Sequence, residues 1–259
     1  MAVRRRPARE ASGSHFLRSK RLAADLATGA GLAAGALAVE IGGGSGVLTD
    51  ALARTGAEVI AIERDPALAA RLRARFEALP SVRIVQADAT TYGWPHEPFV
   101  VVANLPFVRS GAILDRLLRD PRVPLRGAHV IVQWELAAKH ASVWPATLRS
   151  TYWRAWHEIS IARRLHRSAF APPPSVDCAV LCIERRAQPR VPLDAHDAYW
   201  RFLSAAFKAR DPIRRGLRAS LSPLEVKRLA PALGFAPDAR PWEIDAGQWA
   251  SLFAFARQR

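Results

Sequence analysis

The sequence predicts an α/β protein in which a mostly parallel sheet is followed by a smaller all-helical domain. Short apolar runs alternate with amphipathic stretches between residues 37 and 182. Strands that alternate with helices in this way are typical of a parallel sheet covered by helices on both faces. Beyond residue 187, helical periodicity continues without a strand candidate. We therefore expect one domain in residues 1–186 and a second in residues 187–259.

Six apolar runs are the main strand candidates, and they lie at residues 37–41, 58–62, 82–85, 99–103, 129–133 and 176–183. A further run at residues 157–163 precedes the last of them without a helix-length pattern in between, which predicts an antiparallel pair at the end of the sheet. The helix candidates have apolar residues at helical spacing, and they lie at residues 47–55, 66–79, 110–119, 195–209, 223–233 and 246–256.

The chain has a strong excess of positive charge. Its 259 residues include 38 Lys and Arg against 23 Asp and Glu, a formal net charge of +15. Such a surplus favours a polyanionic partner, with nucleic acid first and an anionic membrane a distant second. About half of the surplus lies from Arg185 onward, where 14 residues are basic and 7 are acidic. We therefore expect the helical domain to contact nucleic acid, with Arg214, Arg215 and Arg218 as candidates.

The composition also excludes several classes of protein. No run of ~18 apolar residues is present to span a bilayer, and no apolar signal-peptide core follows the basic start. We expect a cytoplasmic protein with no membrane partner, whose basic residues 1–12 form a mobile tail. Cys178 and Cys182 have no His or acidic partner at ligand spacing, so we expect packing roles for them and no metal site.

A glycine-rich loop follows the first predicted strand. Gly42, Gly44 and Gly46 allow a tight turn and a close approach to a ligand. Their spacing differs from the G-x-G-x-x-G of dinucleotide-binding loops, and an acid, Glu40, precedes them. That carboxylate would repel a pyrophosphate and attract a cationic sulfonium with its ammonium group. A plain strand-to-helix turn is the alternative interpretation of the loop.

Two further acids end the next two strands. Glu63 lies about 20 residues after the glycines, where a carboxylate can accept both hydroxyls of a ribose. Asp88 ends the third strand and suits an acceptor for an adenine amino group. Either acid alone could be a solvated loop carboxylate, but open α/β sheets bind ligands at the carboxyl ends of their strands. We infer an adenosyl ligand without phosphates, for which S-adenosylmethionine is the natural candidate.

The fourth strand ends in the most specific motif of the chain, Asn104-Leu-Pro-Phe107. An adenine N6 is a poor nucleophile, because its lone pair is delocalised into the ring. Two acceptors, one amide oxygen and one backbone carbonyl, would pull this nitrogen toward tetrahedral geometry. Asn104 offers the first, and Pro106 restricts the turn that offers the second. Phe107 provides a π face for a flipped-out base, although N-L-P-F could also be an ordinary strand-ending turn.

Together these motifs resemble those of the ribosomal RNA adenine N6-methyltransferases, a family that includes the Erm macrolide-resistance enzymes and the small-subunit adenine dimethyltransferase. The resemblance covers nearly the whole chain, and it rests on Gly13-Ser-His-Phe-Leu17, Glu40 to Gly46, Glu63, Asp88, Asn104 to Phe107, Phe170-Ala-Pro-Pro-Pro-Ser-Val-Asp177 and Trp249-Ala-Ser-Leu-Phe253. Phe107 stands where the small-subunit enzymes usually carry Tyr, which favours the Erm type.

The resemblance implies a Rossmann-like class I methyltransferase fold and S-adenosyl-L-methionine as cofactor. It implies a monomer that methylates N6 of an adenine in 23S ribosomal RNA and so confers resistance to macrolide-type antibiotics. It assigns catalytic roles to Asn104, Leu105, Pro106 and Phe107, and places the rings of Phe107 and Phe170 on opposite sides of the target base. The cofactor-binding residues that it implies are His15, Leu17, Glu40, Gly42, Gly44, Gly46, Glu63, Arg64, Asp88, Ala89 and Asn104.

One departure and three alternatives remain at this point. The family usually has Gln-Asn where this chain has Ser14-His15, so either the His15 side chain replaces an Asn contact or its backbone carries the role. The nearest alternative activity is dimethylation of small-subunit RNA during ribosome maturation. A binding factor without turnover is disfavoured by the intact N-L-P-F and the three acids, and a nicotinamide oxidoreductase by the glycine spacing.

Overall fold

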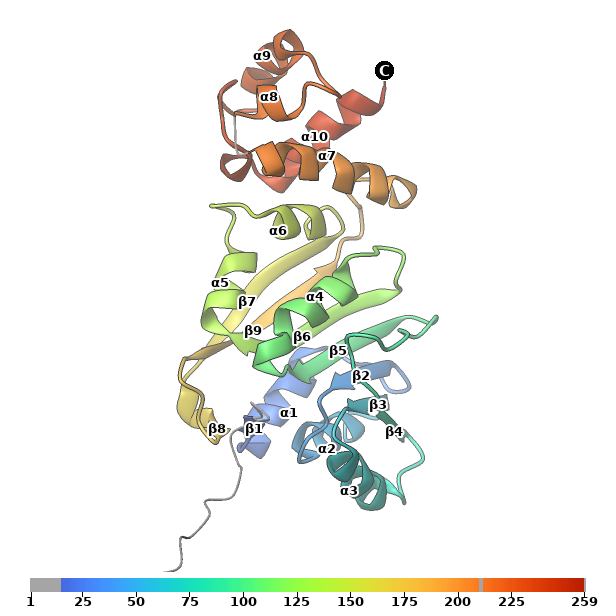
Figure 1. Cartoon of the computed structure of the whole chain (residues 1–259). Helices are drawn as coiled ribbons and strands as arrows, with labels where there is room; N and C mark the ends of the chain where they lie inside the picture. The colour runs from blue at the N-terminus through green and yellow to red at the C-terminus, as the bar shows by residue number, and fades with distance from the viewer. Residues whose placement is uncertain (1–14, 210–211, 259) are drawn as a thin grey trace, which may run out of the picture.

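The computed structural model describes residues 15–209 and 212–258. The predicted basic tail at residues 1–12 lies outside the described residues. Figure 1 shows a sheet domain with a group of helices, α7 to α10, at one end of it beside α6.

The central sheet has seven strands in the order β4-β3-β2-β5-β6-β9-β7. The first five strands in this order, β4, β3, β2, β5 and β6, run parallel to one another. Strand β9 is antiparallel to both of its neighbours, β6 and β7. The mostly parallel sheet and the antiparallel pair at its end are therefore confirmed. The strands are β2 (Leu37–Ile41), β3 (Glu58–Glu63), β4 (Val82–Gln86), β5 (Phe99–Asn104), β6 (Leu125–Gln133), β7 (His157–Leu165) and β9 (Cys178–Arg185).

A second, two-stranded sheet joins distant parts of the chain. Strand β1 (Phe16–Leu17) pairs antiparallel with β8 (Phe170–Ala171). This pairing brings the N-terminal segment against the start of the segment 170–177, next to Asn104 at the end of β5. Strands of two residues give no periodic signal, so the sequence did not predict this pair.

Ten α-helices are present in the described part of the chain, at α1 (Lys20–Gly29), α2 (Val47–Ala53), α3 (Pro66–Phe76), α4 (Ser110–Leu118), α5 (Trp134–Ala141), α6 (Leu148–Trp153), α7 (His196–Ala209), α8 (Ile213–Gly216), α9 (Pro223–Ala232) and α10 (Ala246–Arg257). The sequence predicted all of these except α1, α5, α6 and α8. None of the helices in the described residues is both long and apolar enough to cross a membrane.

Local capping explains where several helices begin. The Asp65 side chain accepts from the backbone N–H groups of Ala67 and Leu68, and Pro66 takes the first position of α3. Asp245 caps α10 in the same way through Gly247 and Gln248. These caps satisfy N–H groups that have no partner inside the helix.

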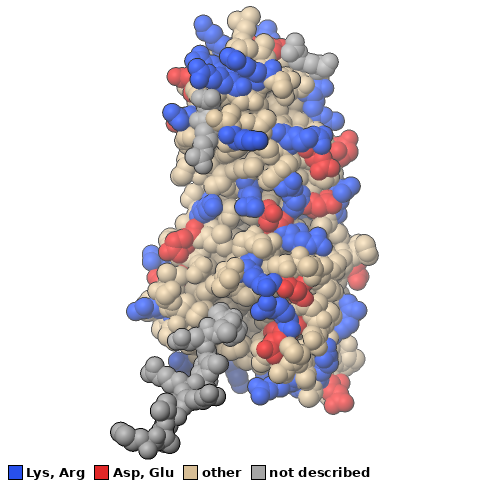
Figure 2. Space-filling view, in the orientation of Figure 1, with Lys and Arg blue, Asp and Glu red and all other residues tan. Residues whose placement is uncertain are grey.

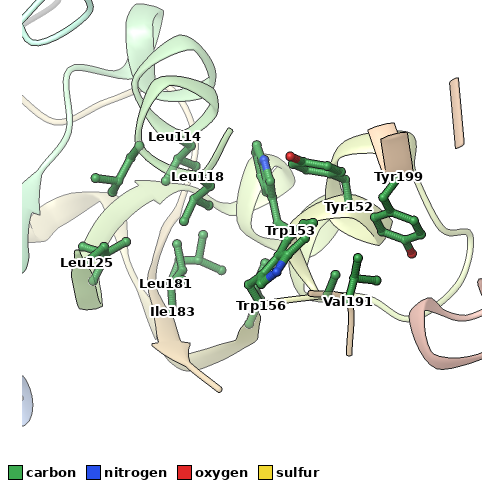
Figure 3. Packing of buried hydrophobic residues seen from close by; sticks show 14 of the residues in the cluster. Leu114, Leu118, Leu125, Tyr152, Trp153, Trp156, Leu181, Ile183, Val191 and Tyr199 are labelled. Atoms are coloured by element: carbon green, nitrogen blue, oxygen red, sulfur yellow. The ribbon is translucent and has the colours of Figure 1, made fainter. Parts of the chain in front are cut away.

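The hydrophobic core continues across the predicted domain boundary. Trp153 and Trp156 are each 1% exposed and lie between the sheet residues Leu181 and Ile183 and the helical residue Tyr199 (Figure 3). All of these side chains belong to one buried cluster. A second cluster fills the opposite face, between α1, α2 and the strands. Strand β9 ends at Arg185, one residue before the predicted boundary, which itself stays a prediction.

Candidate active site

A pocket opens at the carboxyl ends of the parallel strands β2, β3 and β5, with a volume of about 200 Å³. Most of the residues that the sequence predicted for the site line this pocket, namely His15, Gly42, Gly44, Glu63, Arg64, Asp88, Ala89, Asn104, Leu105, Pro106 and Phe107. Leu17, Glu40, Gly46 and Phe170 are not among its lining residues. These four residues therefore do not contact a ligand in the pocket directly in this conformation.

The glycine loop requires glycine for steric reasons. Gly44 has φ of +52°, and a Cβ on it would lie 2.9 Å from the Phe16 ring. Gly46 has φ of +76°, and its Cβ would lie 2.9 Å from the Leu72 side chain. A side chain at either position would therefore be strained and would collide with a packed neighbour. Gly46 shapes the turn into α2 from behind the pocket.

Glu63 holds the loop against the neighbouring strand. Its Oε2 accepts a hydrogen bond from Gly44 N at 2.9 Å, and its Oε1 accepts one from Asp65 N at 2.8 Å. The side chain is 7% exposed, so these bonds fix the carboxylate in place. Each carboxylate oxygen keeps a second lone pair. Glu63 can therefore organise the loop and still accept from ligand hydroxyls.

Glu40 is buried behind the loop. It is 1% exposed, and Thr49 Oγ1 donates a hydrogen bond to its Oε2 at 2.5 Å. Burial, with a smaller contribution from the Glu63 charge, raises the pKa of Glu40 to about 8 against the opposing effect of the Thr49 bond. The sequence predicted a carboxylate in contact with a cationic ligand. The structure instead has an acid that is largely neutral near pH 7 and does not line the pocket.

Asp88 is shared between its own loop and an arginine of the N-L-P-F turn. Its Oδ1 accepts from Thr90 N at 2.9 Å and Thr90 Oγ1 at 2.7 Å, and its Oδ2 pairs with Arg109 at 2.5 Å. The Thr90 bonds and then the Arg109 charge lower the pKa of Asp88. Arg109 lines the pocket, yet sequence reasoning missed it. An arginine after N-L-P-F gives no local signal in a chain this rich in arginine.

The Asn104 side chain has one fixed bond and one free acceptor. Its Nδ2 donates to the backbone carbonyl of His15 at 2.6 Å. A carbonyl only accepts hydrogen bonds, so this contact determines which end of the amide is nitrogen. The other end, Oδ1, is buried and has no partner among the described residues. A buried acceptor left unpaired is costly, which is typical of a group kept for a ligand.

The turn after Asn104 is tied down by its own backbone. Leu105 N donates to Ile131 O at 3.1 Å in the neighbouring strand. Pro106 has φ of −62°, and its carbonyl accepts from Arg109 N at 2.9 Å and Ser110 Oγ at 3.1 Å. Leu105 O, in contrast, accepts no hydrogen bond from the described part of the chain. Asn104 Oδ1 and Leu105 O are therefore two acceptors of this turn without a partner among the described residues.

His15 contributes through both its backbone and its ring. The backbone carbonyl receives the Asn104 bond, so the position supports the motif without needing an Asn side chain. The imidazole Nδ1 donates to Pro172 O at 2.8 Å. The ring stacks on Phe107, with centroids 5.1 Å apart and an angle of 28° between the planes.

The two phenylalanines predicted to frame a base meet edge to face. The ring centroids of Phe107 and Phe170 are 6.3 Å apart, and their planes are inclined by 76°. Phe170 is 1% exposed because it packs into the second hydrophobic cluster. In this conformation the rings do not form two parallel platforms. Stacking on both faces of a base stays a prediction, and it requires at least one ring to turn.

The predicted RNA-contacting arginines lie away from this pocket. Arg214, Arg215 and Arg218 are exposed on and just after α8. Figure 2 shows Lys and Arg side chains gathered at the end of the molecule that holds α8 and α9. The structure therefore separates the pocket from the most basic part of the helical region.

Comparison with known proteins identifies the family. The model of the family described as "Ribosomal RNA adenine dimethylase" matches residues 5–258. The chain belongs to the ribosomal RNA adenine dimethylase family. It is therefore an rRNA adenine methyltransferase, an activity that implies a methyl donor and an RNA substrate.

Members of this family with different names are similar to the chain. The mycinamicin-resistance protein MyrB of Micromonospora griseorubida is 31% identical over 224 residues, 85% of this chain and 70% of MyrB. Ribosomal RNA small subunit methyltransferase A of Sphingopyxis alaskensis is 33% identical over 261 aligned positions, 95% of this chain and 93% of that one.

A solved structure of the family has the same fold. The crystal structure of the 23S rRNA methyltransferase ErmE aligns with a TM-score of 0.82 at 28% identity, covering 94% of this chain and 100% of ErmE. This likeness confirms the predicted class I methyltransferase fold with a helical C-terminal part. It also extends through the helical region, so that region belongs to the family architecture.

Proposed function

We propose that this family member methylates N6 of an adenine in 23S ribosomal RNA and thereby confers resistance to macrolide-type antibiotics. The likeness to ErmE over the full length of that protein supports this substrate, and so does the likeness to MyrB. Phe107 in the N-L-P-F turn is a further argument for the Erm type. The enzyme is proposed to act as a monomer.

The observation that carries the chemistry is the pair of free acceptors in the N-L-P-F turn. Asn104 Oδ1 is buried without a partner, and Leu105 O accepts no bond from the described residues. We assign them to the two hydrogens of the adenine N6 amino group. Accepting both hydrogens withdraws the nitrogen lone pair from the ring and makes it nucleophilic. Their rigid placement supplies both orientation and electrostatic stabilisation.

The pocket residues fit an adenosyl methyl donor. S-adenosyl-L-methionine, when bound, supplies a methyl group on a positively charged sulfur. Glu63 is assigned to the ribose hydroxyls and Asp88 to the adenine amino group, since both carboxylates have remaining lone pairs. The fixed turn at Gly42 and Gly44 lets the backbone approach the ligand closely. Arg64 and Ala89 line the same pocket and are assigned to its walls.

Phe107 is proposed as the first stacking platform for the target base. Its ring lies beside Asn104 and already stacks on His15. Base stacking on an aromatic ring contributes about 1–3 kcal/mol. We propose that the base replaces His15 on one face of Phe107, and that Phe170 turns to contact the other side of the base.

The second candidate function is adenine dimethylation in small-subunit RNA. It is supported by the Sphingopyxis alaskensis relative, which aligns along nearly the whole chain. The two candidates share the same pocket chemistry and differ in the RNA that is bound. An assay of the RNA substrate therefore decides between them.

A methyl-transfer assay tests the proposal directly. Purified protein is incubated with radiolabelled S-adenosylmethionine and either protein-free 23S RNA or intact small subunits, and the modified base is mapped by primer-extension arrest. Asn104→Ala serves as the matched control, because the variant lacks the assigned acceptor. We expect label in 23S RNA that depends on Asn104. Label confined to small subunits would overturn the 23S assignment in favour of the second candidate.

A further inference from the structure

A second cavity lies between the sheet domain and the helical part, and the proposed methylation does not use it. Its volume is about 200 Å³, far above the roughly 10–15 Å³ that one water needs. It is bounded by α6, by the segment that follows β9, and by the start of α10. The cavity lies at the opposite end of the sheet from the N-L-P-F turn. Asn104 pairs with Ile131, and Ile131 pairs with Val180 near the start of β9. The cavity begins beyond Arg185, where β9 ends.

Three arginines line this cavity: Arg154, Arg186 and Arg190. The only acidic residue among the lining residues in the described structure is Asp245, so guanidinium groups outnumber carboxylates by three to one. One Asp245 oxygen already accepts from Gly247 N at 2.7 Å and Gln248 N at 2.9 Å. The lining therefore keeps a positive charge that its own acid does not balance.

Backbone carbonyls hold two of these guanidinium groups in place. One terminal nitrogen of Arg154 donates to Ala141 O at 2.6 Å and to Ile159 O at 3.1 Å. Arg186 Nε donates to Arg154 O at 3.0 Å, and its NH1 pairs with Glu158 at 3.0 Å. Guanidinium groups fixed in this way are preorganised, because they lose little freedom when a ligand arrives.

Arg190 approaches the cavity from the chain segment that leads to α7. Its backbone N–H donates to Ala155 O at 2.8 Å, which attaches this segment to the end of α6. A Cβ built on Gly247, in the first turn of α10, would lie 3.8 Å from its guanidinium carbon. Arg190 therefore lies where the sheet domain meets the helical part.

Two donors at this site are buried and lack an acceptor. Thr151 is 1% exposed, lines the cavity, and its Oγ1 has no partner among the described residues. Arg154 Nε is likewise buried and unpaired within that part of the chain. Each unsatisfied buried donor costs about 1–3 kcal/mol, more when it is charged. Burial and then the charges of Arg186 and Arg190 lower the pKa of Arg154, so these three cations are close enough to repel one another.

We propose that this cavity binds a tetrahedral oxyanion of the phosphate class. Such an anion accepts from several donors at once and pairs with arginine forks in two-point contacts. It would relieve the repulsion between the arginines, and after a turn of the Thr151 side chain it would give Thr151 Oγ1, which has almost no accessible surface in this conformation, its missing acceptor. Because Arg154 and Thr151 belong to the sheet domain and Arg190 to the segment that leads to α7, the bound anion would join the helical part to the sheet domain. The anion comes either from free phosphate or from a phosphate of the RNA backbone.

Inorganic phosphate is the probe for the first experiment. Its binding to the full chain is measured by titration calorimetry, and the melting temperature is compared between phosphate and chloride at equal ionic strength and pH. We expect saturable binding and a higher melting temperature in phosphate for the unmodified protein. Absence of both would overturn the proposal.

Variants locate the bound anion. Thr151→Val removes the hydroxyl while keeping the shape, and Arg190→Gln removes one charge; each should weaken phosphate binding about tenfold or more. Arg149→Gln is the matched control. Arg149 lies on α6, as Thr151 does, but it pairs with Asp115 at 2.8 Å and does not line the cavity. An unchanged dissociation constant in Arg190→Gln, or an equal loss in Arg149→Gln, would overturn the site.

A variant with higher phosphate affinity excludes unfolding as the cause of the changes, because an unfolded protein would not bind phosphate more tightly. Asp245→Asn keeps a good helix cap but removes the opposing charge, so phosphate should bind several-fold more tightly. Weaker binding in this variant would contradict the proposal. The source of the anion is then decided by adding RNA that lacks a methylation site: displacement of phosphate by RNA assigns the site to the RNA backbone, and simultaneous binding assigns it to free phosphate.

Discussion

Asn104 and His15 are 89 residues apart in the chain, and the side-chain amide of one donates to the backbone carbonyl of the other at 2.6 Å. The bond settles the orientation of the amide and leaves Oδ1 as a buried acceptor with no described partner. It also explains why His15 can stand where the family usually has Asn. The contact comes from the backbone, so any residue that keeps the β1–β8 pairing can provide it.

Asn104→Ala is expected to lose turnover and keep cofactor binding. Removing one preorganised acceptor of a transition state costs ~2.7–4 kcal/mol, or about 10²–10³-fold in rate. The measurement is single-turnover methyl transfer, together with calorimetric titration of S-adenosylmethionine. A near-normal rate would contradict the role assigned to Oδ1. Loss of cofactor binding with the same loss of rate would move Asn104 to the cofactor.

His15→Asn is expected to be tolerated. The backbone carbonyl remains for Asn104, while the ring stacked on Phe107 and its Nδ1 hydrogen bond to Pro172 O are lost. Such aromatic pairs contribute about 0.5–1.5 kcal/mol, so cofactor affinity should change less than about tenfold. Urea unfolding and cofactor titration measure the two quantities. If activity vanished, the imidazole would have a role of its own in the reaction.

Glu40→Gln is expected to change how stability depends on pH. The folded state holds the pKa of Glu40 at about 8, above the ordinary value of 4.5. The folded protein therefore binds a proton that the unfolded chain has lost between these two values, so stability falls as pH rises through that window. Above pH 8 the free energy of unfolding of the native protein should be lower than that of Glu40→Gln by up to a few kcal/mol. Near pH 5 the two free energies should be similar.

Urea unfolding at pH 5, 7 and 9 measures this difference. The matched control is Glu58→Gln, an exposed acid at the start of the next strand. Parallel pH profiles for the native protein and Glu40→Gln would show that Glu40 stays ionised in the folded state.

Phe107→Tyr is expected to keep most methyl transfer, while Phe107→Ala should lose it. Stacking needs only a π face, and its removal costs about 1–3 kcal/mol per base. Protein-free 23S RNA is the substrate for both variants, with Val108→Ala as the control because Val108 is 89% exposed on the same turn. Equal rates for the Ala and Tyr variants would exclude stacking as the role of this ring.

Neutralising Arg214, Arg215 and Arg218 together should reduce the salt dependence of RNA binding. Each phosphate contact that is lost lowers the slope of log affinity against log salt by about 0.7–0.9. The control changes Arg71, Arg73 and Arg83, three exposed arginines on α3 and β4, far from α8 in Figure 1. An unchanged slope in the first variant would remove the helical part from the RNA surface.

The sequence predicted what depends on neighbouring residues in the chain. The alternation of apolar runs and helical stretches indicated the parallel sheet and its antiparallel end, because strand and helix periodicities are local properties. The glycines at 42, 44 and 46 indicated a tight turn, and in the structure all three have positive φ. The motif N-L-P-F identified the turn that carries Asn104, because its amide, its proline and its aromatic ring lie within four consecutive residues.

Tertiary structure alone decided how those residues are used. Whether Glu40 is a carboxylate or a neutral acid depends on what covers it, and burial shifts its pKa. Arg109 meets Asp88 because both follow the carboxyl ends of parallel strands at one edge of the sheet, and His15 meets Asn104 because the β1–β8 pairing holds the N-terminal segment there. The arginine cavity is built from α6, the segment after β9 and α10, whose separation along the chain hides their contact. Desolvation and long-range pairing act through space, so local sequence patterns do not reveal them.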